Sequence, residues 1–231
     1  MNTLSLHLQA EHLRETEKYT EALSLYAAVI AAYEAAHDNA GMVEARGGMM
    51  LTHKHLFLTT GKKAHLDEAG RIADEALAIA RQHGLTEKLF RCYFHIGEIA
   101  IIREAFATAI AAYTQSLDLF PGEENAEKGD ILYHLGVAQY RHGEHDLGIS
   151  TILAGIALIE KYESTTDSFV WHVWRSGGYL LLATLLVSEN RTEAERYLGI
   201  AESIILADPR LVIRHRQLQE LKSTVFLHVA R

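Results

Sequence analysis

Histidine is the residue type in this chain with the greatest capacity for site chemistry, since its imidazole can bind metals or move protons. The sequence contains 14 histidines, and the tightest groupings are His53 with His55 and His142 with His145. Side chains two positions apart on a helix point about 200° away from each other, so His53 and His55 cannot share an ion. His142 and His145 lie at a predicted turn with Glu144 and could converge. No set of three ligands is visible, so we expect no metal and no other cofactor, with most histidines exposed or hydrogen-bonded.

Both tryptophans of the chain fall within one short segment. Trp171 and Trp174 are three residues apart, so on a helix they share one face, and Arg175 follows directly. This arrangement could form an aromatic pocket for a peptide or a small ligand. Ordinary packing between neighbouring helix pairs is the alternative interpretation, and the sequence favours it.

Catalytic motifs are missing from the sequence. It contains no GxSxG turn, no P-loop and no dinucleotide-binding fingerprint. The glycine pairs Gly47-Gly48 and Gly177-Gly178 lie inside stretches predicted to be helical, where close packing is favoured over the approach of a ligand. We therefore expect the protein not to be an enzyme.

The net charge and the length of the apolar runs limit the classes of partner that the protein is expected to bind. The formal net charge is −8 and the sequence pI is near 5.9, which argues against a nucleic-acid partner, because phosphate binding relies on clustered Lys and Arg. The longest apolar runs, such as 180–187, are only half as long as a membrane span. The N-terminus lacks the features of a signal peptide. A cytoplasmic protein with no membrane partner is the expectation.

The elements that position these residues are predicted to be helices arranged as repeats. With only two prolines in the chain, long helices are favoured throughout. The clearest unit begins near residue 90 and runs through Tyr93, Gly97, Ala109 and Tyr113 to Pro121. Gly97 and Ala109 would sit where two antiparallel helices cross closely, with aromatic rings filling the space beside the crossing. Pro121 would end the second helix.

Small residues recur at the equivalent crossing position along the chain. They are Ala22, Ala69, Ala109, Gly148 and Ala194, so successive separations are 47, 40, 39 and 46 residues. In the second unit the predicted turn holds about three extra residues, 62–64. A further helix after Pro209 has no partner and would cap the last apolar face.

This pattern resembles the tetratricopeptide repeat (TPR) family. The basic family period is about 34 residues, so the chain is similar to longer-repeat variants such as those of kinesin light chain and bacterial regulators. The resemblance implies an all-α, right-handed superhelical solenoid of about five antiparallel helix pairs, forming a single domain over 1–231. The expected repeats span 3–40, 41–84, 86–121, 126–163 and 168–208, and the expected capping helix spans 210–228.

In this family the first helix of each pair lines a concave binding face. Carried over to this sequence, the resemblance implies a set of partner-binding residues that mixes aromatic, apolar and charged side chains. From the third, fourth and fifth units these are Arg91, Phe94, Glu98, Ile101, Asp130, Tyr133, Val137, Arg141 and Tyr179, to which the Trp171, Trp174 and Arg175 cluster adds three more. Packing between repeats is the alternative role for the apolar members.

Some family members clamp a C-terminal carboxylate with Lys, Arg and Asn, and the corresponding positions here mostly hold other residue types. The predicted function is a non-catalytic scaffold or adaptor that binds a protein or peptide segment. The alternative is a regulatory module that senses a short peptide or small molecule and acts through another protein. Self-association through the terminal helices, around 4–13 and 225–229, is a further possibility.

Overall fold

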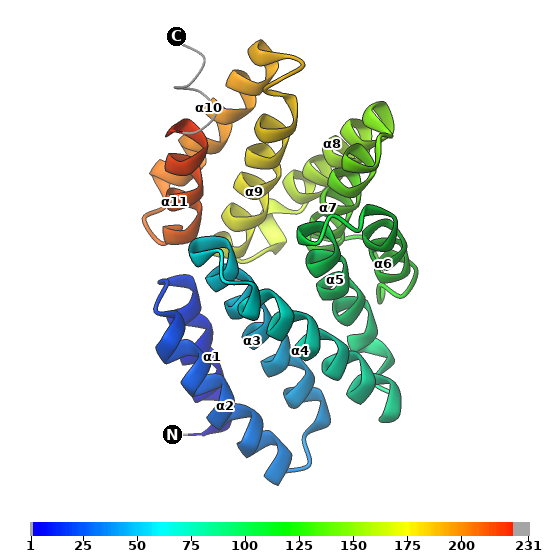
Figure 1. The fold of residues 1–231 in the computed structure, drawn as a ribbon, viewed down its shortest axis with the longest axis vertical. Coiled ribbons are helices and arrows are strands. Elements are labelled where there is room, and N and C mark those ends of the chain that lie inside the picture. The colour runs from blue at the N-terminus through cyan, green and yellow to red at the C-terminus, as the bar shows by residue number, and fades with distance from the viewer. Residues whose placement is uncertain (1, 224–231) are drawn as a thin grey trace. The chain divides into compact units, whose positions relative to one another are not determined.

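The computed structural model describes residues 2–223 and is helical almost throughout (Figure 1). Within that range it contains eleven α-helices, one short 3₁₀-helix (Glu163–Thr165) and no strand, so the predicted all-α class is confirmed. The α-helices are α1 (Thr3–Glu15), α2 (Tyr19–Ala35), α3 (Asn39–Thr60), α4 (Lys63–Gln82), α5 (Thr86–Ile102), α6 (Phe106–Asp118), α7 (Ala126–His142), α8 (His145–Lys161), α9 (Ser168–Leu186), α10 (Arg191–Ala207) and α11 (Val212–Leu221). None of the helices among these residues is both long enough and apolar enough to cross a membrane.

The contacts between Cα atoms divide the chain into two compact units, Met1–Pro121 and Gly122–Arg231. In the first unit, helices α1 to α6 follow one another as three antiparallel pairs, each packed on the next. In the second unit, α7 to α10 form two pairs, and α11 packs on both α9 and α10. The helix-pair architecture is therefore as predicted, while the organisation into a single domain stays a prediction.

Tight turns with left-handed residues join the helices. The turn after α1 has Glu17 at φ 59°, the turn after α2 has His37 at φ 55°, and the turn after α5 has Glu104 at φ 57°. Gly61 and Gly143 occupy the same region at the ends of α3 and α7, where glycine avoids the strain of a Cβ atom. Turns this short force consecutive helices to run antiparallel.

The predicted small residues lie at the helix crossings. Ala22, Ala69, Ala109 and Ala194 are completely buried. A Cβ atom added to Gly97 would come within 2.5 Å of the Tyr113 ring, which confirms that this aromatic side chain fills the space beside the α5–α6 crossing.

The α7–α8 pair has the closest backbone approach that we find. A Cβ atom at Gly136 would lie 2.6 Å from both the Gly148 carbonyl oxygen and the Ile152 amide nitrogen. About two helical turns nearer the N-terminus of α7, a Cβ atom at Gly129 would lie 2.6 Å from the Gly155 carbonyl oxygen. Main chain therefore packs on main chain, and no side-chain rotation could make room for a larger residue at these positions.

The α3–α4 turn differs from the sequence prediction. Gly61 caps α3 and α4 begins at Lys63, so the turn is short and the prediction of an extended turn over 62–64 was wrong. Two of the three additional residues, Lys63 and Ala64, instead lengthen α4 at its N-terminal end, and Lys62 is its N-cap. As a result α4 spans 20 residues, and Leu66 of its first turn belongs to an apolar cluster on which Phe57 of α3 packs.

The expected capping helix corresponds to α11, which begins at Val212; residues 224–228 of the prediction lie outside the described part. Asp208, only 4% exposed, joins this helix to α9. Arg210 donates from Nε to Asp208 Oδ1 at 2.8 Å and from Nη2 to Oδ2 at 2.7 Å, and His172 Nδ1 of α9 lies 2.8 Å from Oδ2. Two effects hold the pKa of Asp208 well below its ordinary value: the hydrogen bonds from Arg210, which have the larger effect, and the hydrogen bond from His172.

We predict that Asp208→Asn destabilises the second unit by about 1.5–3 kcal/mol at neutral pH, the usual range for hydrogen bonds to a charged group. Because the folded-state pKa is lowered, this stabilisation is present above the unfolded-state pKa of about 3.9 and is lost as the pH falls through and below it. Urea denaturation followed by tryptophan fluorescence measures the effect, since both tryptophans lie in this unit. The difference between wild type and variant should shrink between about pH 5 and pH 3; a constant difference over this range would contradict the assignment.

Candidate functional site

On α5, the first helix of its pair, the four predicted residues differ widely in accessibility. The Arg91 side chain is 46% exposed and lies 3.9 Å from Glu44 of α3. Phe94 is half-buried with its ring centroid 5.7 Å from that of Tyr113, and Ile101 is half-buried. Glu98 is buried. Of this set, Arg91 is the side chain that a partner could reach most easily.

Glu98 forms the centre of a buried polar cluster between α3, α5 and α6. Its carboxylate pairs with Lys54 of α3 and accepts a hydrogen bond from the Tyr113 hydroxyl at 3.2 Å. The side chains of Lys54 and Glu98 are only 14% and 8% exposed. Nearby, burial lowers the pKa of His95 to about 3, so that ring is neutral at neutral pH. The predicted contact residue Glu98 thus has a structural partner within its own unit.

The glycine pair of α3 makes room for polar side chains from neighbouring helices. A Cβ atom at Gly47 would lie 2.6 Å from Cε1 of His95, and the space over Gly48 is filled by the Tyr26 hydroxyl and the Glu11 carboxylate. Tyr26 donates to Glu11 at 2.5 Å. The same holds in the second unit, where the Arg214 guanidinium lies over Gly177 of α9. The interpretation of these pairs as close-packing positions agrees with the structure.

On α7, the equivalent four residues are mostly buried. Asp130 and Val137 are buried, and Tyr133 is 1% exposed with its ring stacked on that of His134 at a centroid distance of 4.2 Å. Arg141, at the end of the helix, is exposed. The resemblance therefore placed all four residues on α7 but did not distinguish its buried residues from its accessible ones.

The tryptophan segment lies in α9 and packs largely against α8. Trp171 is buried and donates from Nε1 to the Ile159 carbonyl oxygen at 3.0 Å. The Arg175 guanidinium lies 5.0 Å from the Trp171 ring centroid and 5.7 Å from that of Tyr179, and both Arg175 and Tyr179 donate to the Glu160 carboxylate. Trp174 is half-buried. Three of these four side chains serve helix packing, and a role of the cluster in partner binding stays a prediction.

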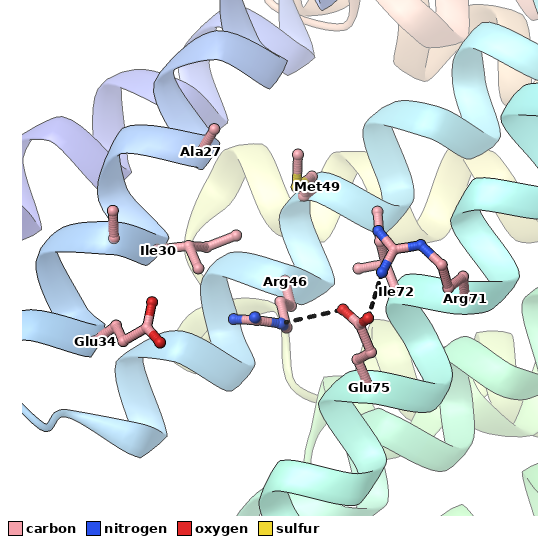
Figure 2. A pocket seen from close by; sticks show the side chains of 9 residues that line it. Ala27, Ile30, Glu34, Arg46, Met49, Arg71, Ile72 and Glu75 are labelled. Atoms are coloured by element: carbon pink, nitrogen blue, oxygen red, sulfur yellow. Dashed lines mark hydrogen bonds and ion pairs between the residues drawn. The ribbon is translucent and has the colours of Figure 1, made fainter.

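A groove in the first unit opens over α3 between α2 and α4 (Figure 2). Its volume is about 290 Å³, at the lower end of the range for ligand sites. α3 packs against both neighbouring helices, which have little direct contact with each other. The lining residues are Ala27, Ile30, Ala31 and Glu34 of α2, Arg46 and Met49 of α3, and Arg71, Ile72 and Glu75 of α4.

The groove combines apolar side chains with a line of charges. Arg46 Nε lies 3.7 Å from Glu75, whose carboxylate also pairs with Arg71. Ile30 and Met49 provide apolar surface beside these charges (Figure 2). A groove of this size and composition can accept one or two side chains of a peptide. Sequence reasoning missed it because its residues come from three helices.

The two histidines at the α7–α8 turn, for which convergence was one possibility, have different partners. His142 Nδ1 lies 3.2 Å from Glu144 Oε1, whereas His145 pairs with Glu189 of the α9–α10 connection at 3.3 Å and stacks on Tyr140. Across residues 2–223 no three His, Cys, Asp or Glu side chains are grouped in a way that could hold a metal ion.

Comparison with known proteins finds matches in three-dimensional structure but none in sequence. No family model and no curated protein matches the sequence. BtubC (BKLC) from P. vanneervenii aligns over 87% of this chain and 79% of its own, with a TM-score of 0.62 and 20% identity. A putative kinesin light chain from Podosopora anserina with nearly identical TPR-like repeats aligns over 87% and 93%, with a TM-score of 0.56 and 15% identity.

A third similar structure is the Rap conjugation gene regulator of plasmid pLS20 in complex with the Phr* peptide. It has a TM-score of 0.64 and 15% identity, and the alignment covers 90% of this chain but only 57% of the regulator. Together with the helix pairs described above, these likenesses decide the fold. The chain has a TPR-like fold.

In a TPR-like fold, the first helices of the pairs are α1, α3 and α5 in the first unit and α7 and α9 in the second. All twelve predicted partner-binding residues lie on α5, α7 or α9. Arg91 and Arg141 are the exposed members, and Phe94, Ile101, Trp174 and Arg175 are half-buried. The others are buried in the unbound chain: Glu98, Asp130, Tyr133, Val137, Trp171 and Tyr179.

Proposed function

We propose that this protein is a non-catalytic module that binds a protein or peptide segment through the accessible residues of its first helices. The observation that carries the proposal is the likeness to the Rap regulator, a protein of the same fold that was solved with a bound peptide. The accessible residues support it chemically, because exposed arginines beside half-buried aromatic and aliphatic groups are typical of peptide-binding surfaces.

The charge of Arg91 and Arg141 allows a direct test. Selection from a phage-displayed random peptide library on the folded protein should enrich a family of related sequences. We predict that the replacement in the unit that holds the enriched peptide, Arg91→Glu in the first unit or Arg141→Glu in the second, weakens binding by about tenfold or more, because it puts a like charge opposite an acidic group of the peptide. Isothermal titration calorimetry measures the change.

The matched control is Arg191→Glu, which makes the same charge change at an exposed position of α10, a second helix. It should leave the affinity within about twofold, because an exposed charge outside the proposed first-helix surface adds only a salt-screened interaction. Equal effects of all three variants, or a library that yields no enriched family, would contradict the proposed surface.

A second candidate function is the sensing of a peptide, favoured by the description of the Rap relative as a conjugation gene regulator. A sensor requires a ligand that binds two conformations with different affinity, whereas a scaffold does not. Fluorophores placed at an exposed site in each unit would report the distance between them. A change in transfer efficiency on saturation with the selected peptide indicates a sensor, and an unchanged value indicates a scaffold.

A further inference from the structure

Two imidazole rings from neighbouring helices face each other on the α3–α4 pair. Nδ1 of His53, on α3, lies 3.2 Å from Nδ1 of His65, on α4. The ring centroids are 5.4 Å apart and the ring planes are inclined by 38°. Both residues are half-buried.

We propose that His53 and His65 together bind a divalent transition-metal ion such as Zn²⁺ or Cu²⁺ through their Nδ1 atoms. Two imidazole nitrogens bonded tetrahedrally to zinc at about 2.0–2.1 Å are about 3.3 Å apart. The observed separation of 3.2 Å therefore needs almost no adjustment. Imidazole is a favoured ligand of zinc and copper, and either ring nitrogen can serve.

The frame that holds the two rings is rigid. Each histidine is adjacent in sequence to a buried residue, Thr52 on α3 and Leu66 on α4. Leu66 belongs to an apolar cluster that also contains Met50 and Ile72 and packs the two helices together. The ring nitrogens are therefore brought together by the folding of the helix pair, so that little further conformational entropy is lost when an ion binds.

The remaining coordination positions belong to water or to one carboxylate. Glu68 follows His65 by three residues on α4 and so lies on the same helix face. Its carboxylate accepts a hydrogen bond from Arg71 Nε at 2.9 Å, and it would have to exchange this partner to reach an ion. Because no third ligand already converges among residues 2–223, we assign two protein ligands and expect Glu68 to add to affinity only modestly.

The same contact in the ion-free protein is a hydrogen bond in which one Nδ1–H donates to the other ring. When a metal binds, the donor ring changes tautomer: its proton leaves Nδ1 for water and Nε2 takes up a proton, so that both Nδ1 lone pairs can coordinate the ion. The proposal is independent of the proposed peptide-binding function, since neither histidine belongs to that set of residues. A negative result for metal binding therefore does not count against peptide binding, and a negative result for peptide binding does not count against metal binding.

The test uses tag-free, full-length protein after treatment with a chelator. Titration with Zn²⁺ against a competing chromophoric chelator should show one site per chain, and His53→Gln or His65→Gln should each weaken it by about tenfold or more, because one ligand and the chelate effect are lost. With Cu²⁺, electron paramagnetic resonance should show nitrogen hyperfine structure from two imidazoles in the wild type and from one in either variant.

The matched control is His142→Gln, which removes a histidine that pairs with a glutamate instead of another imidazole. It should retain the affinity and the two-nitrogen spectrum. Circular dichroism without metal must show that the His53 and His65 variants keep the helical content of the wild type. If Zn²⁺ affinity is the same in wild type and His65→Gln, or if the copper spectrum shows no second nitrogen, the site does not exist.

Discussion

Replacing Gly136 with alanine is expected to destabilise the second unit by about 3 kcal/mol, the upper part of the range for overpacking. The new methyl group would have to occupy a position 2.6 Å from backbone atoms of both Gly148 and Ile152. These are main-chain atoms of a continuous helix, so α7 and α8 would have to move apart along their length. Urea denaturation monitored by tryptophan fluorescence measures the loss, because Trp171 and Trp174 both lie in this unit.

Gly199 provides the matched control for this change. It lies in α10 with no atom within 4 Å of an added Cβ. Gly199→Ala should therefore stabilise the protein by about 0.5–1 kcal/mol, since alanine loses less conformational entropy than glycine in a helix. A Gly136→Ala protein as stable as the wild type would mean that the close α7–α8 crossing is not present in solution.

The second large effect is expected at Glu98. Replacing it with glutamine should lower the free energy of unfolding of the first unit by about 3–5 kcal/mol. The amide cannot neutralise the Lys54 ammonium, which is left largely buried without its carboxylate. Thermal and urea denaturation followed by far-ultraviolet circular dichroism give the stability. Hydrogen exchange should become faster in α3 and α5, the helices that the pair joins.

A double variant separates the loss of the ion pair from damage to the fold. In Lys54→Met/Glu98→Gln the buried positive charge is absent, while the amide oxygen can still accept the hydrogen bond from Tyr113. Most of the lost stability should therefore return, because apolar replacement of a buried ion pair is often close to neutral. A double variant less stable than Glu98→Gln would contradict this account of the pair.

The sequence allowed the helix pairs to be predicted because their signals are local. Two helices of one pair can cross closely only where a small residue lies at the crossing, and Ala22, Ala69 and Ala109 lie at such positions. This requirement arises within the pair and does not depend on the neighbouring pairs. Aromatic residues at a fixed distance from a glycine, such as Tyr113 with Gly97, add a second local signal. The fold class follows from the repetition of such pairs.

The candidate sites depended on information that a single repeat does not contain. Tyr133 occupies a position that faces a ligand in similar repeats, yet it is buried, because depth of burial is set by side chains from neighbouring helices. The His53–His65 pair depends on the register of α3 against α4. The sequence analysis did not predict that register, and it compared His53 with His55, its neighbour in sequence, instead of His65, its neighbour in the structure.

The proposed function requires that a peptide segment binds to the accessible surface of the first helices. Hydrogen–deuterium exchange of the full chain with and without a selected peptide tests it most directly. We predict that added protection appears on first helices, on α3 and α5 of the first unit or on α7 and α9 of the second, and that the replacement in the protected unit, Arg91→Glu or Arg141→Glu, diminishes it. Protection confined to the second helices α6, α8 and α10, with none on the first helices, would contradict the claim.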